Sequence, residues 1–173
     1  KWQLSPHGAG FLYLTEELQS RITQSHLGWL SVDDPWQFYA YDQPLAASAR
    51  RYEPGSLSFP ALWGMHASLG LLLEVGLPAV EDRVLSNSGR LIAALRDIGG
   101  VEIHTPHDPA RHAGIVTIGV APGTDPRRVF VGLSGAGVLV SLREGLIRFS
   151  PHFYNSPSEI DTTVGHLREF VRR

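Results

Sequence analysis

The sequence contains no cysteine and only one lysine and one methionine among its 173 residues. Without cysteine, this chain has no disulfide, no thiolate metal ligand and no cysteine nucleophile. Of the 15 basic residues only Lys1 is a lysine, and the others are arginines. Charged residues make up 18% of the chain and the formal net charge is −2. A chain without a basic excess is not expected to bind nucleic acid or an anionic membrane.

One long segment lacks charge, Gly55–Leu73, "GSLSFPALWGMHASLGLLL". Its length is that of a membrane span. However, Pro60, three serines and one histidine interrupt it, and Glu74 closes it. We therefore expect a buried helix and no membrane association. The first residues also lack the apolar core of a signal peptide, and we expect a cytoplasmic protein.

The second half of the chain predicts an α+β fold. From Val101 onward the patterns read strand, strand, helix, strand, strand, helix, with Asp125 capping the first of these helices and Ser156 or Ser158 the last. Such an order is typical of helices packed on one face of a mostly antiparallel sheet. Two helices, Phe59–Val75 and Pro78–Ile98, are expected before it.

The first part of the chain is less regular. "GFLYL" at Gly10–Leu14 predicts a strand, Thr15 the start of a helix, and residues 27–57 an irregular loop rich in aromatic side chains. The strand would have no sheet to join unless that sheet lay upstream. We therefore divide the chain into residues 1–57, a remnant of a larger domain with the aromatic loop, and residues 58–173, a C-terminal small domain with its linking helices.

Three places have residues suited to chemistry. A neutral lysine amine at Lys1 can form a Schiff base with a carbonyl, although most lysines are simply solvated. Gly55 and Ser56 form a turn before a helix, where N–H groups and a hydroxyl suit an anionic oxygen; plain helix capping by Ser56 or Ser58 is the commoner use, and composition alone favours it. Arg148 lies in an apolar strand and is suited to a bidentate carboxylate contact, or to facing water at a sheet edge.

The eight histidines show no zinc-type spacing. Three of them occur in "HTPHDPARH", but in a loop without a fixed scaffold. No metal site is therefore expected.

Three segments in this order, "KWQLSPHGAGFLYL", "RRYEPGSLSFPAL" and "SLREGLIRFSPHFYNSPSEID", resemble the C-terminal half of class V aminotransferase-fold enzymes. This superfamily depends on pyridoxal 5'-phosphate and includes cysteine desulfurases, selenocysteine lyases, isopenicillin-N epimerase and kynureninase. The resemblance implies the C-terminal small domain of that transferase fold. It also implies that Lys1 holds the cofactor as a lysine aldimine, that Gly55 and Ser56 reach the cofactor phosphate of the other subunit of a homodimer, and that Arg148 binds the substrate α-carboxylate.

The departures from the family pattern restrict the reaction. The residues that would stack on the cofactor ring, pair with its nitrogen and hold most of its phosphate precede Lys1 in the family, so this chain by itself is expected to be inactive. "REG" joins the last two strands where desulfurases have a longer loop with a cysteine. We therefore expect a lyase, aminotransferase or epimerase acting on an amino acid. The alternative is a non-catalytic dimerisation or interaction domain whose cofactor-binding half is absent or degenerate.

Overall fold

The computed structural model describes residues 1–172, which form two compact units, Lys1–Leu71 and the chain from Leu72 onward. The helices are α1 Glu16–Arg21, α2 Phe59–Val75, α3 Leu77–Leu95, α4 Pro126–Gly135 and α5 Pro157–Arg172, with 3-10 turns at Ala49–Tyr52 and Pro109–Arg111. The strands are β1 Val101–Ile103, β2 Val116–Val120, β3 Ser141–Arg143 and β4 Leu146–Phe149. The division at residue 57 proposed from the sequence remains a prediction.

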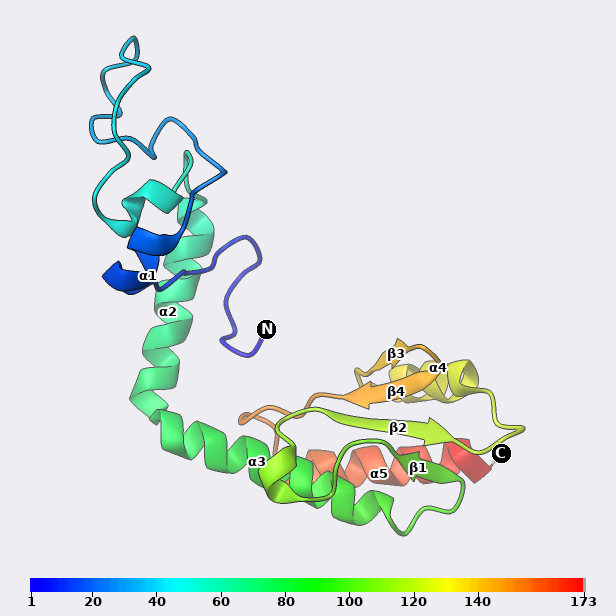
Figure 1. Ribbon diagram of the computed structural model, residues 1–173. Helices are drawn as coiled ribbons and strands as arrows, with labels where there is room; N and C mark the ends of the chain where they lie inside the picture. The colour runs from blue at the N-terminus through cyan, green and yellow to red at the C-terminus, as the bar shows by residue number, and fades with distance from the viewer. Residues whose placement is uncertain (173) are drawn as a thin grey trace. The chain divides into compact units, whose positions relative to one another are not determined.

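The second unit is the α+β layer that the sequence predicts. Its strands form one antiparallel sheet in the order β1-β2-β4-β3. Helices α3 and α5 run along one face of this sheet (Figure 1), and α4 packs against α5 and the β3–β4 edge. The mixed fold class is therefore confirmed.

Alternation along the strands places the core on the helical side of the sheet. Ile147 and Phe149 of β4 and Val116 and Ile118 of β2 are buried there. They meet side chains of α3, α4 and α5 in one hydrophobic cluster. Burial of these apolar surfaces is the main term that stabilises the unit.

The helix starts follow local rules. Thr15 accepts a hydrogen bond from Leu18 N, and Asp125 accepts one from Arg127 N, so both act as N-caps. Ser156 caps α5: its hydroxyl accepts from Glu159 N, while the Glu159 carboxylate accepts from Ser156 N, which is a capping box. All three were predicted positions.

The strand expected at Gly10–Leu14 is a wrong prediction. These residues lie outside regular structure. A strand is stable only when a neighbour satisfies its N–H and C=O groups, and no strand pairs with this segment among residues 1–172.

Helix α2 has the predicted bounds, but the prediction that it is buried is wrong for this chain. Phe59, Trp63 and Leu73 are each more than 60% exposed. The helix is apolar on all sides, and the described residues cover only part of it. No single helix within residues 1–172 is long and apolar enough to cross a membrane; α2 and α3 meet that test only as a pair joined across a break.

Candidate functional site

Arg148 lies on the face of the sheet that the helices leave open. In β4 its neighbours Ile147 and Phe149 turn into the core, so Arg148 turns the other way. It stands opposite Thr117 of β2 and Ser141 of β3. The arginine therefore occupies a central strand with a small hydroxyl residue on each side, and is not the water-facing arginine of an edge strand.

The N–H donors of the Arg148 guanidinium have no acceptor among the described residues. Its Nε is buried and has no hydrogen-bond partner, and no ion pair or side-chain hydrogen bond engages the rest of the group within residues 1–172. A buried donor without an acceptor is costly. The planar fork of donors matches the two oxygens of a carboxylate. This arrangement fits a carboxylate ligand that arrives from outside the described residues.

The loop after β4 is tied to α3 by Asn87, which is buried. Its Nδ2 donates to the carbonyls of His152 and Asn155, at 3.0 and 2.9 Å. Asn155 Oδ1 in turn accepts from His152 N. These bonds fix the chain immediately downstream of Arg148. Sequence reasoning missed Asn87, although an asparagine in the apolar stripe between Val84 and Leu91 was a usable signal.

The β3–β4 connection is as tight as an antiparallel hairpin allows. Arg143 pairs with Leu146, and the two residues between them, Glu144 and Gly145, both have positive φ, at 49° and 78°. Such a two-residue turn with left-handed backbone is the type I′ pattern. The connection between β3 and β4, close to Arg148, is therefore two residues long and contains no extended loop.

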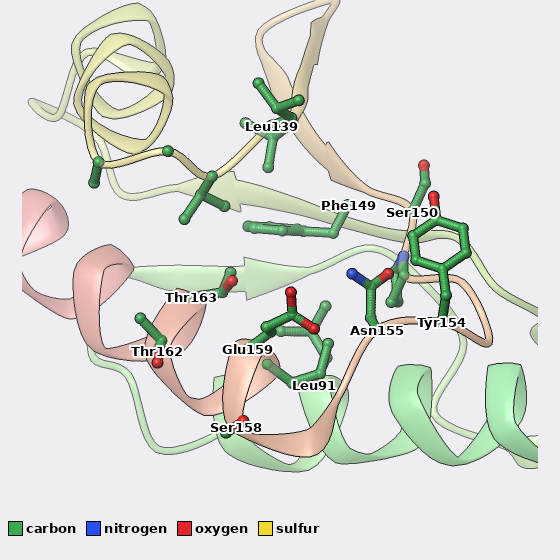
Figure 2. Close-up of a pocket in the computed structure, with 16 residues that line it drawn as sticks. Leu91, Leu139, Phe149, Ser150, Tyr154, Asn155, Ser158, Glu159, Thr162 and Thr163 are labelled. Carbon is green, nitrogen blue, oxygen red and sulfur yellow. The ribbon is translucent and has the colours of Figure 1, made fainter.

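A cavity of about 490 Å³ lies elsewhere in this unit. Figure 2 shows Phe149 reaching into it, with Leu91, Glu159 and Thr163 along its walls. Because Phe149 and Arg148 project from opposite faces of β4, this cavity is not the space in front of the guanidinium. The sequence did not predict it.

Gly55 and Ser56 lie in the turn that precedes α2, and Ser56 is exposed. Neither the Ser56 nor the Ser58 hydroxyl makes a capping bond to α2 among the described residues. The N–H groups of Gly55 and Ser56 have no acceptor there either. The capping role that composition favoured is thus not found, and the turn presents free donors of the kind an anion requires.

Lys1 is exposed in the same unit as this turn. Its carbonyl accepts from Leu4 N at 2.9 Å, which closes a tight turn. The segment then contacts α2, since a Cβ on Gly64 would lie 2.4 Å from Pro6 Cγ. Glycine at position 64 therefore permits this contact. Arg148 belongs to the other unit.

Within residues 1–172 no group of three or more histidine, aspartate or glutamate side chains is arranged to hold a metal ion. Two of the three histidines of "HTPHDPARH" make local contacts instead. His112 Nδ1 lies 2.9 Å from the Asp108 carbonyl, and His104 Nε2 lies 3.9 Å from Glu102 Oε2.

Comparison with known proteins gives one family. A family model described as "Aminotransferase class-V" matches residues 1–162. An uncharacterised aminotransferase of Bacillus subtilis, YcbU, is 25% identical over 96% of this chain and 42% of its own length. A probable cysteine desulfurase of Pyrococcus abyssi is 23% identical over 99% of this chain and 45% of its own length.

Solved structures share the fold. The apo cysteine desulfurase of Thermococcus onnurineus NA1 superposes with a TM-score of 0.86 at 25% identity, over 98% of this chain and 44% of that chain. The cystine C–S lyase C-DES, in complex with its product cysteine persulfide, gives a TM-score of 0.84 at 23% identity over the same shares. The chain thus spans less than half the length of the proteins it matches.

Proposed function

Because the chain belongs to the class V aminotransferase family, whose members depend on pyridoxal 5'-phosphate, we propose that it is the C-terminal part of an enzyme that acts on an amino acid. The observation that carries this proposal is Arg148. Its guanidinium lies on the open face of a rigid sheet, with a buried Nε that no described residue satisfies. In this proposal the guanidinium holds the α-carboxylate of the substrate bidentately.

Lys1 and the turn before α2 have the other roles. The Lys1 amine is the nucleophile that would hold the cofactor covalently, and once released it would take or return the proton at the substrate Cα. Gly55 and Ser56 would donate hydrogen bonds to the cofactor phosphate held mainly by the partner in a homodimer. The cofactor itself supplies the electron sink for charge at Cα. The free donors of this turn fit an anionic phosphate.

Within this chemistry we propose a lyase or aminotransferase type of reaction and no protein-bound persulfide. The support is the absence of cysteine in this chain and the two-residue β3–β4 turn. Several of the similar proteins are named cysteine desulfurases, which weighs against this restriction. One similar structure is named a C–S lyase, and an aminotransferase is among the relatives.

The decisive experiment uses the protein at its full natural length. It is treated with borohydride in the presence of pyridoxal 5'-phosphate, digested and analysed by mass spectrometry. We expect a pyridoxyl group on Lys1 and none after Lys1→Ala. Label on another residue, or none, contradicts the assignment. Product analysis over a panel of amino acids then separates elimination from amino transfer and from epimerisation.

A second candidate is a non-catalytic interaction module, which the exposed aromatic side chains of Trp36, Phe38 and Tyr39 favour. The same labelling experiment separates the two functions. A module without catalysis would leave every lysine unlabelled, while its self-association or partner binding would still depend on these aromatic residues.

A further inference from the structure

A second and smaller cavity, of about 210 Å³, lies between α3 and the loop that joins β1 to β2. The 3-10 turn Pro109–Arg111 of this loop lies beside α3 (Figure 1). Both segments supply the walls, with Leu85, Gly89, Ile92, Ala93 and Arg96 from the helix side and His107, Pro109 and His112 from the loop. None of these residues lines the larger cavity of Figure 2, and Arg148 is not among them.

The ionisable side chains that line this cavity are all basic. Arg96 is permanently charged, His107 and His112 can become so, and no aspartate or glutamate of the described chain is part of the lining. The side chains of Arg96 and His107 make no hydrogen bond or ion pair within residues 1–172. An arginine at the end of a helix is common by itself, because it complements the helix dipole. Two histidines facing it across a cavity are not explained in that way, and together the three groups favour an anion.

The loop holds His112 in a defined position. The Asp108 carbonyl accepts from Arg111 N and lies 2.9 Å from His112 Nδ1. The Asp108 carboxylate accepts from Ala110 N and so caps the 3-10 turn. Because a carbonyl can only accept, Nδ1 carries a proton, and Nε2 is the nitrogen that remains for a ligand. In its charged form the ring can donate from Nε2 to an anion.

The α3 wall of the cavity is mostly apolar, and it contains a glycine. Leu85 and Ile92 come from the same side of α3, and Gly89 lies between them in the interior of the helix. Glycine is less favourable than alanine at such a position. A Cβ at Gly89 would meet no atom within 4 Å, so close packing does not require a glycine there. Its absent side chain leaves space in the cavity that a larger residue would fill.

We propose that this cavity binds a small organic carboxylate with an apolar body. Arg96, His107 and His112 contact the carboxylate, and the wall formed by Leu85 and Ile92 contacts the body. The volume is below the range of about 300–1,000 Å³ that is usual for drug-sized ligands, so the acid must be small. Inorganic phosphate would satisfy the basic groups but would leave the apolar wall without a contact. The inference does not depend on the proposed function, because it uses neither Lys1 nor Arg148.

The test uses benzoate as the probe, and benzamide as a compound of the same shape without the charge. Protein of full natural length, with ¹³C-labelled histidine, is titrated at about pH 6 and followed by NMR, where a histidine can carry charge. His107→Gln and His112→Gln assign the two signals. We expect both signals to shift saturably with benzoate. Benzamide and inorganic phosphate should each bind at least about tenfold more weakly, since each lacks one of the two kinds of contact.

Two variants separate the charge from the space. Arg96→Gln should lower benzoate affinity by at least about tenfold. Gly89→Leu keeps all three basic groups, fills the cavity and replaces glycine by a strong helix former, so it should fold and lose the benzoate response. Arg83→Gln is the matched control, because Arg83 is an exposed arginine of the same helix outside the cavity, and it should bind as wild type does.

The signals of His107 and His112 report on this cavity alone, so benzoate that binds elsewhere in the protein does not affect the result. The absence of a saturable shift in these two signals overturns the inference. Equal binding of benzamide or phosphate also overturns it, as does wild-type affinity in Arg96→Gln or in Gly89→Leu, or an equal loss in Arg83→Gln.

Discussion

Arg148 stands directly opposite Thr117 in the antiparallel pair of β2 and β4, and both residues face away from the helices. The guanidinium is therefore carried by an interior strand whose other face is buried in the core. A ligand that binds there meets a donor fork that the sheet has already positioned.

The first prediction concerns this arginine. Arg148→Ala should lower kcat/KM for the amino-acid substrate by at least about tenfold, because a charge-assisted contact is lost. Arg148→Lys should recover only part of the loss, since an ammonium cannot bind a carboxylate bidentately. Steady-state kinetics measures both.

The control for this prediction is Arg143→Ala. Arg143 is exposed in β3 and lies on the same face of the sheet, opposite Leu146. It should retain wild-type kcat/KM. An Arg148→Ala protein with unchanged kcat/KM would remove Arg148 from the site.

The second prediction tests the tie between α3 and the loop after β4. Asn87→Ala leaves the carbonyls of His152 and Asn155 without their buried donor and should cost on the order of 2 kcal/mol in the free energy of unfolding. Denaturant titration of the full-length protein measures this. Ser88→Ala is the control, because the Ser88 hydroxyl bonds only to carbonyls of its own helix, and little change is expected. Equal effects of the two changes would contradict the assigned role of Asn87.

The third prediction concerns the base of the aromatic loop. Gly28→Ala forces a Cβ into the Pro54 carbonyl and should destabilise the unit by about 1–3 kcal/mol. Gly70→Ala places its methyl group in open space within a helix and should be neutral or stabilising. A fully stable Gly28→Ala protein would mean that the close approach at Pro54 is absent in solution.

The fourth prediction is a pH dependence. Hydrogen bonds from the Ser156 backbone N–H and then from its hydroxyl lower the pKa of Glu159. A carboxylate with a lowered folded-state pKa contributes stability above its unfolded value of about 4.3, and that stability is lost as pH falls through the lower folded value. Wild type should therefore lose more stability between about pH 6 and about pH 3 than Glu159→Gln. Thermal unfolding at both pH values measures this.

Glu169→Gln is the control for the fourth prediction, because it makes the same change near the other end of α5, outside the capping box. It should keep the acid sensitivity of wild type. If Glu159→Gln also keeps it, the capping box does not contribute to the pH dependence of folding.

Features that depend on neighbouring residues were predictable from the sequence. The bounds of α2 and the caps at Thr15 and Asp125 follow from short-range rules. Helical periodicity, capping hydrogen bonds and strand alternation depend on residues that are close in the sequence. The local sequence is therefore enough to predict these features. The family resemblance, confirmed over residues 1–162, added the chemistry that these patterns alone left open.

Only the tertiary structure decided which distant residues meet. The apolar pattern at Gly10–Leu14 predicted a strand, but strand formation needs a partner that the pattern cannot supply. Asn87 bonds to the loop after β4 because this loop passes within hydrogen-bond distance of α3. Trp29 reached Gly55 because the 25 intervening residues fold back through the Gly28–Pro54 contact and the Arg50 bonds. These are long-range contacts, and their existence depends on the path of the whole chain as well as on local propensity.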